Sequence, residues 1–148
     1  MMEIPAELID SMLKDTISIG DVYLLKMDES NDVTPKSGDD YRYKFYIVLG
    51  FDSLGNVYGG VIVNSSVNQR LSQSIKDFHI PISCSKYSFL KKDSFVNCAN
   101  LKPYPLSNFI HSYKLGIIQQ DDLDMIIKTV VASPNEKKVN LKRFGLIK

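Results

Sequence analysis

The chain has 148 residues, of which 44% are hydrophobic and 24% are charged. This length and composition predict one globular domain with a single sizeable core, and they exclude wholesale disorder. The net charge of +1 argues against a broad nucleic-acid binder, and no apolar run approaches the roughly 20 residues that span a bilayer.

The first part of the chain predicts a helix, a strand and a long loop. Residues 1–18 have Pro5 at a helix start, followed by apolar side chains at the spacing of one helical face, at positions 8, 9, 12 and 13. A strand is predicted over 21–27, and the polar residues that follow it read as a loop over 28–43. Residues 28–41 carry a net charge of −4, which would repel an anionic ligand, so we expect this loop to be mobile without ligand and to gate the site.

A β-hairpin is predicted next in the chain. Two apolar runs, over 44–51 and 57–64, flank a turn that contains glycine at 52–56. The polar stretch over 67–74 is consistent with either a short helix or a loop.

The second half of the chain predicts two further strands, over 77–84 and 93–98, and a brief apolar segment at 115–118. An amphipathic helix is predicted over 121–131, with carboxylates in its first turn, and Ser133-Pro134 ends it. Many short strands with a docked terminal helix indicate a mainly-β fold, a small and strongly bent sheet or barrel.

The charge is distributed unevenly. Residues 134–148 carry a net charge of +4 and residues 1–133 carry −3. A basic tail of this kind suits a polyanion or an acidic partner, and the alternative is a solvated, frayed terminus.

The two cysteines, Cys84 and Cys98, show no metal-ligand spacing. Because the start of the chain lacks a signal-peptide pattern, we expect two buried thiols in a reducing cytoplasm, with a disulfide as the alternative.

Most catalytic motifs are absent from the sequence. It has no HExxH, no CxxC pair, no GxGxxG and no Walker pattern, so we expect neither a metal site nor a nucleotide cofactor. His79 and His111 lie among apolar and aromatic neighbours, where a structural role is the commoner one. Phosphodiester cleavage without a metal ion remains, because attack by the 2′-hydroxyl of RNA needs only proton transfer and charge stabilisation.

Several segments in a fixed order resemble the PemK/MazF family of toxin endoribonucleases. The resemblance covers residues 19–132. It rests on six segments in this order: a strand that begins with Gly-Asp, a loop, a strand that begins with a cation, a strand that ends in hydroxyl residues, a short strand that begins with an acidic residue, and a last amphipathic helix. These correspond here to Gly20–Leu25, 28–43, Lys44–Gly50, Val61–Ser66, 93–101 and Gln119–Val131.

The resemblance implies an SH3-like, bent antiparallel barrel of the PemK/MazF/CcdB type over 19–133, with an N-terminal helical extension over 1–18 and a basic tail over 134–148. It implies a metal-independent endoribonuclease that needs no cofactor, cleaves single-stranded RNA through the 2′-hydroxyl and is controlled by a cognate antitoxin. It also implies a homodimer. We expect the dimer surface to use an excess of apolar side chains, those of Leu115, Ile117, Ile118, Met125 and Val131.

The family's catalytic cation and hydroxyl carry over to neighbouring pairs of residues. Lys44 stands where the family has an arginine, and Arg42 lies on the same face of the strand by alternation. The phosphate-binding hydroxyl corresponds to Ser65, with Ser66 next to it. Three further residues are expected to contact RNA: Asn64, Asn68 and Lys36.

The sequence departs from the family pattern at the cation, since lysine cannot make the bidentate phosphate contact of arginine, and Phe45 replaces the following proline. Arg42 and Lys44 can therefore also be read as surface cations that balance Asp39 and Asp40, and the two serines as a plain turn. The corresponding alternatives in function are a catalytically inactive barrel that binds RNA or protein, and a purely structural partner protein.

Overall fold

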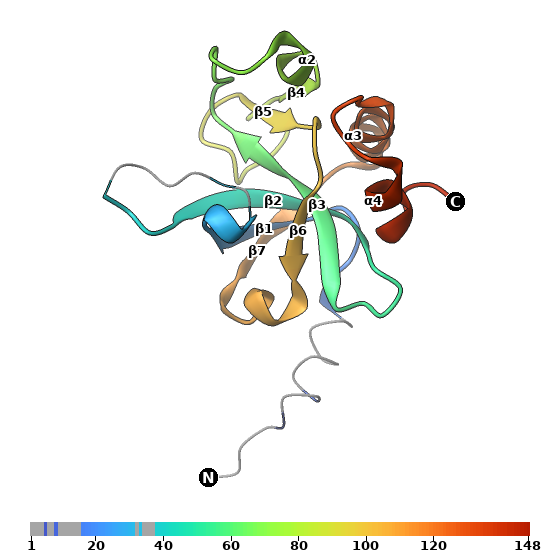
Figure 1. Ribbon diagram of the computed structural model, residues 1–148. Coiled ribbons are helices and arrows are strands. Elements are labelled where there is room, and N and C mark those ends of the chain that lie inside the picture. Colours follow the sequence, from blue (N-terminus) through green and yellow to red (C-terminus); the bar gives the residue numbers. More distant parts are fainter. Residues whose placement is uncertain (1–4, 6–7, 9–15, 32, 34–37) are drawn as a thin grey trace.

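The structure is a computed structural model, which describes residues 5, 8, 16–31, 33 and 38–148. Its main element is a seven-stranded antiparallel sheet with the order β4-β5-β3-β2-β1-β7, in which β6 pairs with another part of β3 (Figure 1). The strands are β1 (Asp21–Met27), β2 (Arg42–Phe51), β3 (Val57–Asn64), β4 (His79–Ile82), β5 (Ser94–Asn97), β6 (Lys102–Pro105) and β7 (Tyr113–Ile117). The helices are η1 (Glu29–Asn31), α2 (Gln73–Lys76), η2 (Leu106–His111), α3 (Gln120–Ala132) and α4 (Lys138–Arg143). The mainly-β prediction is confirmed.

The β2–β3 hairpin organises the sheet. Its two strands pair from Phe45↔Val63 to Phe51↔Tyr58, with a register shift between Val48 and Gly50 that bends the ladder. β5 pairs with the last residues of β3, whereas β6 pairs with its first half. Because one long strand serves two different neighbours at its two ends, the sheet curves into a barrel-like shape.

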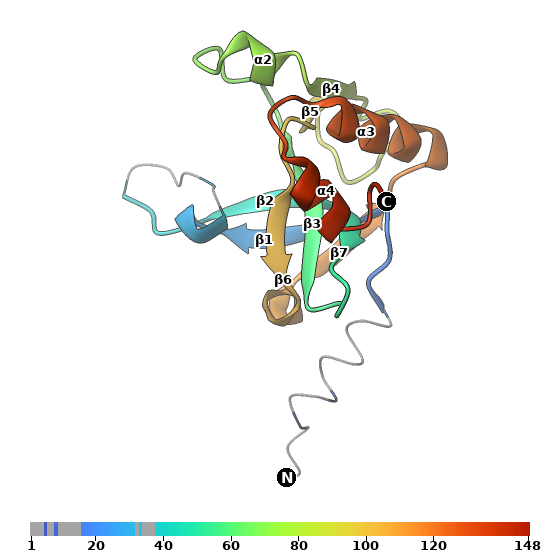
Figure 2. The same cartoon turned by 45° about the vertical axis from the view of Figure 1, so that its right-hand side comes forward.

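Both faces of the sheet are buried. Side chains alternate along β2, so that Ile47 and Leu49 enter one apolar cluster while Tyr46 and Val48 enter a second one. The first cluster also contains buried residues of α3 and α4, which lie next to each other in both cartoon views (Figure 2). The second cluster is built around aromatic rings. Phe109 packs edge-to-face on Tyr104, with the ring centroids 5.0 Å apart.

Helix α3 matches the helix predicted over 121–131. Its buried face carries Leu123, Ile126 and Val130, as the apolar spacing requires. The Tyr87 hydroxyl accepts a hydrogen bond from the backbone N–H of Gln119 at 3.1 Å and donates one to the Asp122 carboxylate. These bonds fix the start of the helix against the barrel.

The alternative reading of residues 134–148 as a frayed, solvated terminus is wrong. Leu141 and Phe144 are buried in the first apolar cluster, while the five cations of this segment stay exposed. The close approach depends on glycine: a Cβ at Gly59 would lie 2.5 Å from Cγ of Phe144. The last fifteen residues therefore pack on the hairpin and contribute to the core.

Four strands differ from the predictions. β2 begins at Arg42 rather than at residue 44, and β4 and β5 are shorter than the runs predicted over 77–84 and 93–98. β6 was not predicted, because Pro103 and Pro105 argue against a strand. Both cysteines are free, as expected, although Cys98 is buried and Cys84 is only half-buried.

The residues expected at a dimer surface divide into two groups. Ile118 is buried in the core and Leu115 packs against it, so neither is available to a partner. Ile117, Met125 and Val131 are exposed. The N-terminal helix predicted within 1–18 and the middle of the predicted 28–43 loop lie mostly outside the described residues. No helix in the described part of the chain has the length and apolar character needed to cross a membrane.

Candidate functional site

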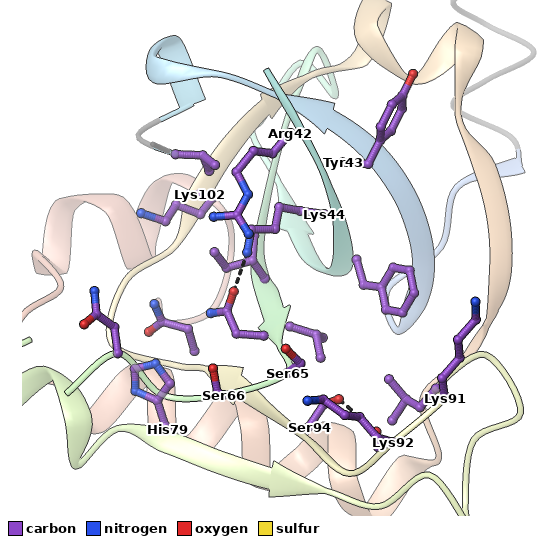
Figure 3. Close-up of a pocket in the computed structure, with 18 of the residues that line it drawn as sticks. Arg42, Tyr43, Lys44, Ser65, Ser66, His79, Lys91, Lys92, Ser94 and Lys102 are labelled. Carbon is purple, nitrogen blue, oxygen red and sulfur yellow. Dashed lines mark hydrogen bonds between the residues drawn. The ribbon is translucent and has the colours of Figure 1, made fainter. Parts of the chain in front are cut away.

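A groove of about 990 Å³ lies at the open end of the β2–β3 hairpin (Figure 3). It is lined from β2, β3, β4, β5, β6 and the turn that precedes β5. Its most distinctive feature is charge, because none of the described residues that line it is acidic, while five are basic: Arg42, Lys44, Lys91, Lys92 and Lys102. A concave surface lined by one sign of charge concentrates counter-charged ligands, so the groove favours an anion.

Lys44 is buried rather than exposed. It pairs with Leu25 of β1 in the middle of the sheet, is 9% exposed, and its Nζ donates a hydrogen bond to Oδ1 of Asn64 at 2.5 Å. Lys102 on β6 is buried to the same degree, at 8% exposure. The alternative reading of Lys44 as a surface cation is therefore wrong.

Arg42 lies on the same side of β2 as Lys44, as strand alternation predicts. Figure 3 shows Arg42 and Lys44 on one side of β2, and Lys102 of β6 also lines the groove. The carboxylates of Asp39 and Asp40 line a separate small hollow together with Asp28 and Glu29, and not the groove. The acidic part of the preceding loop and the basic groove are thus distinct surfaces.

The hydroxyl and amide groups of the groove come mainly from the end of β3. Ser65 and Ser66 directly follow this strand and are both exposed in the groove, next to the half-buried Asn64. Asn68 also lines it, and its Oδ1 accepts a hydrogen bond from the backbone N–H of Arg70 at 3.0 Å. Lys36, the remaining residue expected to contact RNA, lies outside the described residues. The structure thus places six of the seven sequence-derived candidates in one groove.

Three lysines and one histidine that line the groove were not identified as site residues from the sequence. Lys102 was missed together with its strand, and Lys91 and Lys92 sit in a turn whose position is set by the fold. His79 was read as structural, yet it lines the groove.

The imidazole of His79 is held from one side. Its Nδ1 lies 3.0 Å from the carbonyl oxygen of Ile75. Because a carbonyl only accepts hydrogen bonds, Nδ1 carries a proton, and in the neutral form of the ring Nε2 is therefore the acceptor. His79 is half-buried, and Figure 3 shows it beside Ser66. The sequence does not show that His79 lines the groove, because strand alternation alone does not tell which face of β4 is turned toward it.

Comparison with known proteins supports the fold alone. No protein-family model matches the chain. No curated protein matches it in sequence either. Among solved structures, the chain is similar to a chain of the MazE–MazF complex from Deinococcus radiodurans, with a TM-score of 0.55 and 12% identity over 82% of this chain and 98% of that one. The architecture is therefore a MazF-like barrel, in agreement with the resemblance seen in the sequence.

Proposed function

We propose that the groove binds single-stranded RNA and cleaves it, and that the protein is a toxin-like endoribonuclease. The observation that carries this proposal is the groove itself, in which five cations and two serine hydroxyls converge without a carboxylate among the described lining residues. Its position on a MazF-like barrel supports the same reading. Such a surface neutralises phosphates and keeps hydrogen-bond donors for their oxygens.

The proposed reaction uses the substrate's own 2′-hydroxyl. Its oxygen forms a bond to the adjacent phosphorus while the bond from phosphorus to O5′ breaks, which leaves a 2′,3′-cyclic phosphate and a free 5′-hydroxyl. Nε2 of His79 takes the proton from the 2′-hydroxyl, and the Lys44 ammonium gives one to the departing O5′.

The remaining groups act on the charge of the transition state. Arg42 can bind two phosphoryl oxygens at once, which lysine cannot do. Ser65 and Ser66 donate hydrogen bonds to the same phosphate. Preorganised donors of this kind are each worth about 3 kcal/mol when they are aimed at developing charge.

Two further parts of the proposal concern partners. The similar structure is a complex named for two proteins, MazE and MazF, and we extend this to a cognate antitoxin that inhibits the present chain. The exposed Ile117, Met125 and Val131 on β7 and α3 provide an apolar surface for a homodimer. A monomeric mass at micromolar concentration would contradict the dimer.

The activity is tested with purified protein and a long single-stranded RNA in the presence of EDTA. We expect cleavage at selected sites, with 5′-hydroxyl ends on the downstream products. An oligonucleotide with a single 2′-deoxy substitution at a mapped site should resist cleavage there. Intact RNA after prolonged incubation, or cleavage that ignores the 2′-deoxy substitution, would contradict the proposal.

A second candidate function is an RNA-binding module without catalysis, and the lysine at the arginine position favours it. Binding would then weaken steeply with salt, because each neutralised phosphate releases counterions. With up to five contacts, the slope of log K against log salt would reach about −3.5 for a single strand. Steep salt dependence without any cleavage would select this function.

A further inference from the structure

The groove has an apolar side as well as a charged one. Tyr43 lies between Arg42 and Lys44 in the chain, so alternation directs its side chain to the opposite face of β2. Figure 3 shows Tyr43 on the other side of the strand from Arg42 and Lys102. Tyr43 nevertheless lines the groove, and the residue is 58% exposed. One short stretch of β2 therefore presents cations to one side and an aromatic ring to the other.

The apolar side is held rigidly by the core. Phe45, two residues beyond Tyr43, is half-buried and packs edge-to-face on Phe89, with ring centroids 5.9 Å apart. The neighbouring Leu90 is buried and also lines the groove. On its outer side, Tyr43 meets the ring of Tyr41 edge-to-face at 5.6 Å. A flat ligand placed here would meet a surface that needs little rearrangement.

We propose that Tyr43 stacks on a nucleobase of the single-stranded RNA whose phosphate lies at Arg42 and Lys44. This inference rests on the proposed function. A single strand carries its phosphates and its unpaired bases on different sides, which matches the division of the groove by β2. Stacking on an aromatic ring tolerates every base, because each has a π-face. In a duplex the bases are already stacked and paired, so this contact selects single strands.

Lys91 and Lys92 extend the site beyond the ring. They line the groove on the side where Figure 3 shows Tyr43, away from Arg42 and Lys102. A strand that crosses β2 would therefore meet cations at both ends of the aromatic segment. Alternating positive charge and aromatic surface is the usual arrangement for single-stranded nucleic acid.

Two other exposed tyrosines differ from Tyr43, and one of them, Tyr113, serves as a control. Tyr113 on β7 is 71% exposed but does not line the groove. Tyr41 has its ring covered by the Lys26 ammonium at 4.0 Å and lies next to Asp39 and Asp40, which repel phosphate. Of the three exposed tyrosines in the described part of the chain, Tyr43 is the one that lines the groove.

The test measures the affinity of the full chain for a short fluorescent oligoribonucleotide whose 2′-hydroxyls are methylated, so that it is not cleaved. Fluorescence anisotropy is recorded for the parent, Tyr43→Ala, Tyr43→Phe and Tyr113→Ala. We expect about tenfold or greater weakening for Tyr43→Ala. Tyr43→Phe keeps the ring, and Tyr113→Ala lies outside the groove, so both should stay within twofold of the parent. An oligonucleotide with abasic positions should bind the parent and Tyr43→Ala equally.

Three outcomes would overturn the inference while cleavage by the parent still supports the proposed function. Equal affinities for Tyr43→Ala and Tyr113→Ala would show that the ring does not contact RNA. A loss in Tyr43→Phe equal to that in Tyr43→Ala would assign the effect to the hydroxyl. A changed molecular mass of Tyr43→Ala with unchanged RNA affinity would make the ring part of a protein–protein surface.

The two proposals fail in different ways. A parent protein that neither binds nor cleaves RNA overturns both. A parent that binds with the expected dependence on Tyr43 but cleaves nothing overturns only the catalytic proposal.

Discussion

The two ends of the β2–β3 hairpin have opposite properties. At the turn end, glycines leave room for the C-terminal segment: a Cβ at Gly50 would lie 2.0 Å from the carbonyl oxygen of Phe144, and one at Gly59 would overlap its ring. At the open end the corresponding positions carry Lys44 and Asn64, and the space beside them is the cationic groove. The same pair of strands is therefore covered at one end and hollow at the other.

The difference shows how one hairpin separates stability from function. Glycines without side chains let a buried ring close the turn end, where it removes apolar surface from water. Polar side chains at the open end, among them the buried Lys44, line a groove and leave a site for a ligand. We expect substitutions at the turn end to change folding, and those at the open end to change activity.

The largest effect is expected at the closed end. Phe144→Ala removes a buried ring and should lower the free energy of unfolding by about 3–5 kcal/mol. Chemical denaturation measures this, and Val139→Ala, an exposed position on α4, is the control with a change within about 0.5 kcal/mol. RNA affinity of the folded fraction should stay within twofold. A groove that loses affinity in this variant would show that the two ends are coupled.

At the open end, Lys44→Met keeps the length of the buried stem but removes the charge. Cleavage should slow by about a hundredfold or more, which corresponds to about 3 kcal/mol of lost transition-state stabilisation. Lys128→Met, an exposed lysine on α3, should cleave like the parent. Single-turnover rates and melting curves distinguish the two. A Lys44→Met protein that cleaves normally would remove Lys44 from the mechanism.

A smaller effect is expected for Asn64→Ala, which removes the acceptor that holds the Lys44 ammonium. Hydrogen bonds to charged groups are worth about 1.5–3 kcal/mol, so cleavage should slow by roughly tenfold through misplacement of Lys44. The double variant Asn64→Ala/Lys44→Met should cleave RNA about as slowly as Lys44→Met alone, because Asn64 acts through the Lys44 ammonium. Full additivity in this double-mutant cycle would mean that Asn64 acts independently.

The smallest effect concerns the hydrogen bonds that fix α3. Burial raises the pKa of the Asp122 carboxyl, but hydrogen bonds from Tyr87 and Lys86 outweigh it, and the net result is a lowered pKa. The stabilisation is therefore present above the ordinary aspartate pKa of about 3.9 and is lost as the pH falls through the lower folded value.

Tyr87→Phe removes both hydrogen bonds of the Tyr87 hydroxyl, the one donated to Asp122 and the one accepted from Gln119, and should cost about 1–2 kcal/mol at neutral pH. The variant should also lose less stability than the parent on acidification below about pH 4. Denaturant midpoints at pH 7 and pH 3 measure both quantities. A parallel pH dependence in the two proteins would assign the shift to Lys86 alone.

Local patterns in the sequence predicted the central elements well. The strands over 21–27 and 57–64 have the predicted bounds, and α3 differs from its prediction by one residue at each end. The alternation of apolar residues in a strand and their 3.6-residue spacing in a helix are properties of short segments. In these elements the apolar face is also the face that is buried in the structure. The sequence does not predict β6, because two prolines in four residues locally disfavour a strand. Pairing with β3, a contact between distant segments, forms the strand all the same.

The sequence predicted part of the candidate site. The predicted residues are neighbours along a strand, and the missed ones come from distant segments of the chain. Arg42 and Lys44 share a face because alternation requires it, and Asn64, Ser65 and Ser66 follow from the end of a strand. Lys102 and His79 enter the groove only because β6 pairs with the first half of β3 and β4 joins the sheet through β5. No local pattern encodes that arrangement.

The sequence by itself determined the class of fold, the hairpin, the amphipathic helix and the candidates that neighbour one another along two strands. Only the tertiary structure decided that Lys44 is buried, that the basic tail packs through Phe144, and that Tyr43 borders a groove shared with distant lysines. The physical reason is that strand and helix periodicity depends on residues a few positions apart. Burial and convergence depend instead on how the sheet bends and on which segments fill the space it leaves.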